Sequence, residues 1–110
     1  MTREALGEFE QLVLLAIVRL GADVYGVPIA AEIGRRTGRT VSNAAVYVTL
    51  RRLEQKGLLS SSMSAPTAER GGKARRCVSV TRAGIEGLRA SRFAIESMWK
   101  GLDPGLGRNR

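Results

Sequence analysis

Histidine is missing from all 110 positions of this sequence, and its absence removes several kinds of site at once. Histidine is the commonest general base, the usual zinc ligand and the side chain that most often titrates near neutral pH. The remaining residues offer neither a base–nucleophile pair nor a cluster of metal ligands. We therefore expect no enzyme, no metal site and no cofactor.

Cysteine is nearly missing too, because Cys77 is the single thiol of the chain. One thiol cannot form an intramolecular disulfide or a thiolate metal cluster, so a reducing cytosol fits best, although an intermolecular bond stays open. Two interpretations of Cys77 remain. Neighbouring arginines could activate it as a redox sensor, or it could be an ordinary thiol buried in a strand.

Long apolar runs are also lacking. The stretch from Leu12 to Val18 is far shorter than the ~20 apolar residues that span a bilayer. The chain begins MTREALGEFE, with acidic residues before any apolar run. We therefore expect no secretory signal and a cytoplasmic location.

Acidic residues are outnumbered, with 10 Asp and Glu against 18 Lys and Arg, which gives a formal charge of +8. Such an excess favours a polyanionic partner, usually nucleic acid and sometimes an anionic membrane surface. A chain of this length forms one small domain.

Helical periodicity predicts two helices before residue 40. The first runs from Glu4 to Leu20. Its second half is apolar nearly all round, so it needs cover on more than one side, and a second subunit could supply it. The second runs from about Val27 to Arg36. A short connection through Gly38 leads to a third helix, and this order is typical of a helix-turn-helix.

The third helix, with Ser42 as its N-cap and Gly57 as its stop, is the centre of the prediction. One apolar stripe anchors it, and its other faces carry hydrogen-bond donors and cations. The stripe is Val46, Leu50 and Leu53, and the polar residues are Ser42, Asn43, Tyr47, Thr49, Arg51, Arg52 and Gln55. Such a helix suits a DNA major groove, although an ordinary amphipathic surface helix is the alternative.

From Leu58 onward, the spacing of the apolar residues changes. Partial alternation over Ser60 to Ala65 and Arg75 to Thr81 predicts a hairpin with Gly71 and Gly72 near a basic, mobile tip. A last helix follows from about Arg82 to Leu102. Its apolar seam consists of Leu88, Ile95, Trp99 and Leu102. We expect a DNA-binding domain over residues 1–81, a dimerisation helix over 82–102 and a flexible tail over 103–110.

Three pieces of sequence carry a resemblance. They are Tyr25-Gly26 followed by Ile29, then Val46-Tyr47 with Leu50-Arg51-Arg52-Leu53-Glu54 and Lys56-Gly57-Leu58, and then Gly71-Gly72-Lys73-Ala74-Arg75-Arg76 leading to Val80-Thr81-Arg82-Ala83-Gly84. In order and spacing they resemble the PadR family of bacterial winged helix-turn-helix regulators, over roughly Leu6 to Leu102. The resemblance implies a mainly α fold with a small β-hairpin and a C-terminal dimerisation helix.

The resemblance also implies a function, namely a homodimeric repressor that binds a pseudo-palindromic operator in double-stranded DNA. Ser42, Asn43 and Tyr47 are candidates for base-edge or phosphate contacts, and Arg51 for a phosphate. The wing cations, expected at phosphates or in the minor groove, are Arg70, Lys73, Arg75 and Arg76. They could instead be a solubilising charge run, and Tyr47 could be partly buried. A non-specific architectural protein and a protein-interaction module remain as alternatives.

An effector is the last expectation. Resemblance to drug- and phenolic-acid-responsive members of the family implies an apolar cavity between subunits, where Trp99 stacks on a small planar aromatic ligand. Phe9, Val13, Ile95 and Met98 would line that cavity. The alternative places Trp99 in the core of the dimer interface.

Overall fold

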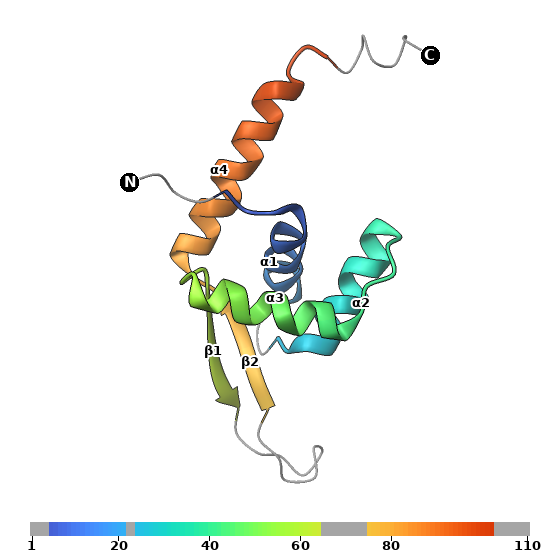
Figure 1. The fold of residues 1–110 in the computed structure, drawn as a ribbon, viewed down its shortest axis with the longest axis vertical. Coiled ribbons are helices and arrows are strands. Elements are labelled where there is room, and N and C mark those ends of the chain that lie inside the picture. Colours follow the sequence, from blue (N-terminus) through green and yellow to red (C-terminus); the bar gives the residue numbers. More distant parts are fainter. Residues whose placement is uncertain (1–4, 22–23, 65–74, 103–110) are drawn as a thin grey trace.

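The computed structural model describes residues 5–21, 24–64 and 75–102. Its elements are α1 (Glu8–Leu20), α2 (Gly26–Thr37), α3 (Asn43–Gln55), β1 (Leu59–Ser64), β2 (Arg75–Val80) and α4 (Arg82–Trp99). The hairpin points away from one end of the molecule and α4 from the other (Figure 1). This order confirms the predicted mainly α fold with a small hairpin. The predicted tip glycines and the 103–110 tail lie outside the described residues.

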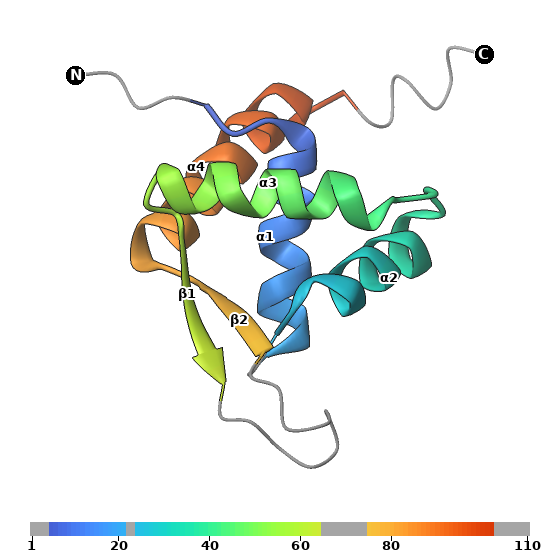
Figure 2. The same ribbon diagram turned by 60° about the horizontal axis from the view of Figure 1, so that its bottom comes forward.

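The core lies where α1, α2 and α3 meet, and Figure 2 shows α3 crossing α1 with α2 beside it. The predicted stripe of α3 is confirmed, since Val46, Leu50 and Leu53 are all buried. They pack with Ile29 and Ile33 of α2 in one apolar cluster. Each fully buried side chain of this size contributes about 1.5–3 kcal/mol, so the stripe fixes how α3 is presented to solvent.

Side-chain caps fix where two helices begin. Ser42 Oγ accepts the Ala45 N–H at 3.0 Å and Thr81 Oγ1 accepts the Gly84 N–H at 3.1 Å, as predicted for both residues. Gly57, at a φ of 77°, follows the end of α3 in the left-handed region. A side-chain cap contributes about 1 kcal/mol to stability, and these two caps fix where α3 and α4 begin.

Two predicted helix ends were wrong. The first helix begins at Glu8 and not at Glu4, because Gly7 is its N-cap and donates its N–H to Glu10 Oε1 at 2.9 Å. A glycine inside a helix costs about 1 kcal/mol relative to alanine, so the cap position suits it better. The last helix ends at Trp99 and not at Leu102, before Gly101 with its φ of 84°.

The hairpin is tied to the helices by backbone hydrogen bonds. Its antiparallel register pairs Leu59 with Val80 and Ser64 with Arg75. A further bridge was not predicted, and in it the Val78 N–H donates to the Val24 carbonyl at 2.8 Å. This bridge joins β2 to the connection between α1 and α2. The hairpin, which is the wing of the winged helix, is therefore fixed to the helical core.

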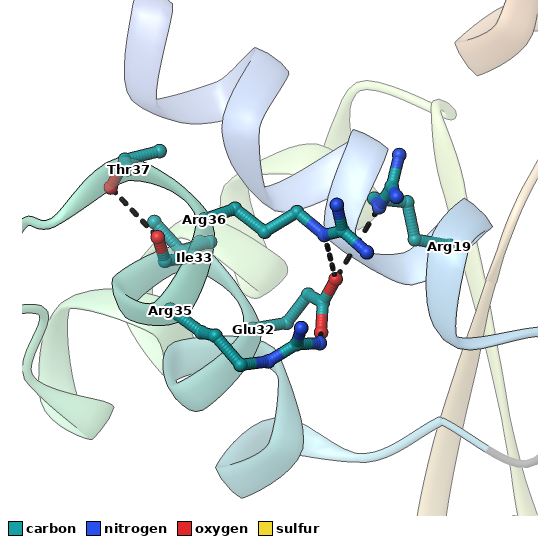
Figure 3. Close-up of polar contacts among 6 residues, drawn as sticks. All are labelled: Arg19, Glu32, Ile33, Arg35, Arg36 and Thr37. Carbon is teal, nitrogen blue, oxygen red and sulfur yellow. Dashed lines mark hydrogen bonds and ion pairs between the residues drawn. The ribbon is translucent and has the colours of Figure 1, made fainter.

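Three arginines surround one buried carboxylate where α1 and α2 meet (Figure 3). Glu32 is 6% exposed, and its Oε2 lies 2.7 Å from Arg36 Nε and 3.4 Å from Arg19 Nε, while Oε1 accepts a hydrogen bond from Arg35. The hydrogen bond from Arg36, helped by Arg35, outweighs desolvation and lowers the pKa of the Glu32 carboxyl. The cluster ties the end of α1 to α2.

A second buried carboxylate joins the start of α1 to the end of α3. Glu10 Oε2 lies 2.9 Å from Lys56 Nζ, and both side chains are largely buried. Burial alone would raise the pKa of Glu10, but the hydrogen bonds from the Gly7 N–H and from Lys56 outweigh it and lower that pKa. Both carboxylates therefore bind their proton less tightly in the folded chain than in the unfolded one.

Candidate nucleic-acid interface

The outer face of α3 is polar and open. Ser42 and Asn43 at the start of α3, and Tyr47 and Arg51 further along it, are all exposed. Thr49 is the exception, because it is only 5% exposed and its predicted place among the outward residues was wrong. It lies three residues after Val46 and four before Leu53 on the helix surface, so it joins their stripe in spite of its hydroxyl.

A groove of about 570 Å³ separates α3 from the hairpin and the start of α2. It is lined by Tyr25, Gly26, Tyr47, Leu50, Arg51, Glu54, Arg76 and Val78. Three of the residues predicted to bind DNA, Tyr47, Arg51 and Arg76, therefore meet in one groove although they come from α3 and β2. This meeting is what a surface that binds both bases and phosphates requires.

Gly26 makes the position of the Tyr47 ring possible. A Cβ at Gly26 would lie 2.5 Å from the ring, closer than real contacts allow. Tyr47 therefore packs its ring edge on the first residue of α2 while half of its surface stays exposed. The ring is therefore partly packed, and the contact of Tyr47 with DNA stays a prediction.

Arg76 is the wing cation that the structure places most fully. Its guanidinium Nη1 lies 3.7 Å from Glu54 Oε1 of α3 and donates to Ser61 Oγ of β1 at 3.4 Å. Arg75 belongs to β2, whereas Arg70 and Lys73 lie outside the described residues. Sequence reasoning missed Tyr25 and Glu54 as groove residues, because neither has a signal apart from the tertiary packing.

A second surface, of opposite character, lies on α4. Its outer half exposes Phe93, Ile95, Met98 and Trp99, and Leu102 follows the helix end. An apolar groove of about 480 Å³ runs between this helix and α1. The residues lining it are Gln11, Leu15, Val18, Ile85, Leu88, Arg89, Arg92, Ile95 and Glu96. Large exposed apolar patches mark sites that bind another protein, a ligand or a membrane.

Val13 does not belong to this surface. Its side chain is 0% exposed and packs in the core of the protomer, so its predicted place in a cavity between subunits was wrong. The periodicity that put it beside Phe9 is real, but Val13 lies in the core, whereas Phe9 is only partly buried at its margin. Ile95, Met98 and Trp99 are the members of the predicted set that face solvent.

Comparison with known proteins settles the family. A family model described as the transcriptional regulator PadR-like family matches residues 14–90, which is more than half of the chain. This chain belongs to the PadR-like family. The resemblance stated from the three sequence pieces is thereby confirmed, and the protein is a PadR-family transcriptional regulator. No curated protein matches the sequence.

Solved structures of PadR proteins share the fold. A PadR-like regulator from Bacillus cereus aligns with a TM-score of 0.71 at 20% identity, covering 93% of this chain and 93% of its own. A PadR-family regulator from Clostridium difficile gives 0.70 at 23% identity, covering 91% and 99%. A third, from Eggerthella lenta, gives 0.61 at 27% identity, covering 92% and 84%.

Within residues 5–21, 24–64 and 75–102, no group of three or more Cys, Asp or Glu side chains is placed to hold a metal ion. None of the described helices is long and apolar enough to cross a membrane. Cys77 is buried in β2, which is the ordinary interpretation of that thiol.

Proposed function

We propose that this PadR-family protein is a sequence-specific DNA-binding repressor that acts as a homodimer. The observation that carries the proposal is the groove in which Tyr47 and Arg51 of α3 meet Arg76 of the hairpin, beside the open polar face of α3. In this proposal α3 lies in the major groove. Ser42 and Asn43 at its N-terminal end contact base edges, where an asparagine can pair bidentately with adenine.

The phosphate contacts come from α3 and the wing together. Tyr47 and Arg51 bind backbone phosphates on the near side of the major groove. The wing cations Arg70, Lys73, Arg75 and Arg76 follow the backbone or enter the next minor groove. The phosphate contacts set the register and the affinity of binding. The contacts of Ser42 and Asn43 with base edges set the sequence preference.

In this proposal, α4 and the neighbouring face of α1 form the dimer interface. Phe93, Ile95, Met98 and Trp99 are exposed in the protomer, and the α1–α4 groove continues their apolar surface. A two-fold contact there buries this surface and places two α3 helices in successive major grooves of a pseudo-palindromic operator. In the division proposed from the sequence, residues 1–81 bind DNA and residues 82–102 dimerise.

An effector completes the proposal. A small planar aromatic ligand stacks on Trp99 between the subunits, with Phe9, Ile95 and Met98 near it, and releases the repressor from its operator. Such a ligand acts by favouring one spacing of the two α3 helices over another.

Fluorescence anisotropy tests the DNA-binding proposal. The duplex upstream of the protein's own gene is compared with a scrambled duplex over a range of salt concentrations. A preference of about 10³ or more at physiological salt supports specific recognition. Equal binding of both duplexes, and of neighbouring promoters, replaces the repressor with an architectural protein. No binding to any duplex leaves a protein-interaction module.

A further inference from the structure

The groove beside α3 contains one acidic side chain among those that line it, Glu54. It lies in the last turn of α3, and its side chain is 41% exposed. An acid on a surface proposed to bind a polyanion lowers the affinity, so its presence there needs a reason. Its contacts supply one.

Glu54 is held in place by the hairpin. Its Oε2 accepts the Ser61 hydroxyl of β1 at 2.7 Å, and its Oε1 lies 3.7 Å from Arg76 Nη1 of β2. The Arg76 guanidinium also donates to Ser61 Oγ at 3.4 Å. Three side chains from three elements therefore form one closed polar cluster.

The strand register explains why these three side chains meet. Ser61 pairs with Val78 and Met63 pairs with Arg76, so Ser61 and Arg76 are diagonal neighbours on the same face of the hairpin. Val78 on that face is buried, which fixes the hairpin against the core. The same face lines the groove that holds Tyr47 and Arg51.

The Arg76 side chain is 66% exposed, so the groups around it leave it open to a second anion from solvent. A phosphate that approaches the groove competes with the Glu54 carboxylate for the same guanidinium. While Glu54 stays beside Arg76, the pair has no net charge, and the cation displaces little of the counterion layer on DNA. The strength of this wing contact therefore depends on the acid beside it.

We propose that Glu54 is a positioning residue that restrains DNA binding through Arg76, which exchanges this carboxylate for a backbone phosphate when the protein binds a duplex. The inference rests on the proposed DNA-binding function. Its effect is on phosphate contacts, so it is the same for every sequence. It makes Glu54 an internal competitor of DNA and not a DNA contact.

The variant Glu54→Gln tests the exchange, with a fluorescein-labelled duplex of scrambled sequence as the probe. We expect affinity at physiological salt to rise about two- to fivefold per protomer, the range that an exposed ion pair contributes. The slope of log K against log[salt] becomes steeper by up to about 0.9 per protomer, because no freed carboxylate then takes up a cation to offset the counterion that Arg76 releases from DNA. Unchanged or weaker binding with an unchanged slope overturns the proposal.

Arg76→Gln and the double variant locate the effect. If Glu54 acts through Arg76, the double variant binds like Arg76→Gln alone, and the gain disappears. A gain that persists without Arg76 is a general charge effect and overturns the proposed route. The matched control is Glu8→Gln, which removes an exposed acid paired with Arg39 at 2.8 Å outside this groove, and its slope stays that of the wild type.

The two proposals fail in different ways. A scrambled duplex that binds as well as every promoter rejects specific repression but leaves the Glu54 effect measurable. A wild-type protein that binds no duplex at all rejects both. Equal circular dichroism spectra and melting temperatures of all variants show that binding, and not folding, has changed.

Discussion

At the scale of single residues, Gly26 lies against a side chain of another helix. The absent Cβ leaves room for the Tyr47 ring, and that ring borders the groove proposed to bind phosphates. The lack of a side chain at Gly26 of α2 thus decides where the Tyr47 ring of α3 lies. The aromatic and the glycine form one structural unit although 21 positions separate them.

Substituting Gly26→Ala tests this unit. The added methyl group forces the ring to move, and overpacking of this kind costs about 1–3 kcal/mol. We expect a lower melting temperature together with weaker DNA binding. Tyr47→Phe keeps the ring and removes the hydroxyl, so it should weaken binding while the melting temperature holds. If Gly26→Ala melts and binds like the wild type, the ring contact is not a constraint.

Two buried carboxylates make stability depend on pH. Glu10 and Glu32 both have a pKa below the ordinary value of 4.5 in the folded chain. Their contribution is therefore complete above the unfolded pKa and is lost as pH falls through the lower folded pKa. We expect the melting temperature to fall steeply below about pH 4.5.

The variants Glu10→Gln and Glu32→Gln check that assignment by thermal unfolding from neutral to acidic pH. Each should melt lower than the wild type at pH 7, because a charged hydrogen-bond partner is lost. Each should also lose less stability on acidification, since one titrating group is gone. Curves parallel to that of the wild type would show that other carboxyls cause the acid loss.

At the scale of elements, α4 has two different halves. The first half is packed, with Gly84, Gly87 and Leu88 buried against the core. The second half, from Ala90 to Trp99, is exposed throughout apart from Ser91, which is partly buried. A stably folded helix with this much apolar surface in solvent needs a partner, and a second copy of the chain is the proposed one.

Introducing a charge on that face should separate the subunits. Ile95→Glu places a carboxylate in the α1–α4 groove, and we expect sedimentation velocity to show a monomer where the wild type is a dimer. Ser62→Glu makes a similar charge change at an exposed position of β1, outside α1 and α4. It should leave the dimer intact. A dimer that survives Ile95→Glu places the interface elsewhere.

Some features of the helices and strands were predictable from the sequence, and others were not. Caps at Ser42 and Thr81 and the stripe of α3 were predictable because each is local and periodic. Thr49 and Val13 were misplaced for related reasons. Polarity was taken as exposure for Thr49, and a helix that is apolar nearly all round gave no sign of which side Val13 faces. The Val24–Val78 bridge is a single pair between distant segments, which no period reveals.

The candidate site was predictable only in part. The pattern of α3 identified Tyr47 and Arg51, and the basic stretch identified Arg76. Their meeting in one groove depends on the hairpin register and on the packing of α2. Glu54 was hidden for the same reason, because its two partners come from strands seven and more residues away.

At the scale of the whole molecule, a single tryptophan reports on assembly. Trp99 is the one tryptophan in the sequence and is 47% exposed in the protomer. If the proposed dimer forms, its emission should shift to shorter wavelength as protein concentration rises, and Ile95→Glu should abolish the shift. An emission maximum that stays constant while the sedimenting mass doubles would place Trp99 outside the interface.

The direct junction between β2 and α4 has a consequence for the operator. Thr81 follows the last residue of β2 and caps α4, and Gly84 packs so closely on the Leu58 carbonyl that a Cβ would lie 2.3 Å from its oxygen. No flexible linker separates the hairpin from the helix proposed to hold the partner. In the proposed dimer, the distance between the two DNA-binding surfaces is therefore fixed. One base pair inserted between half-sites turns them by about 35° and moves one out of the dimer's reach.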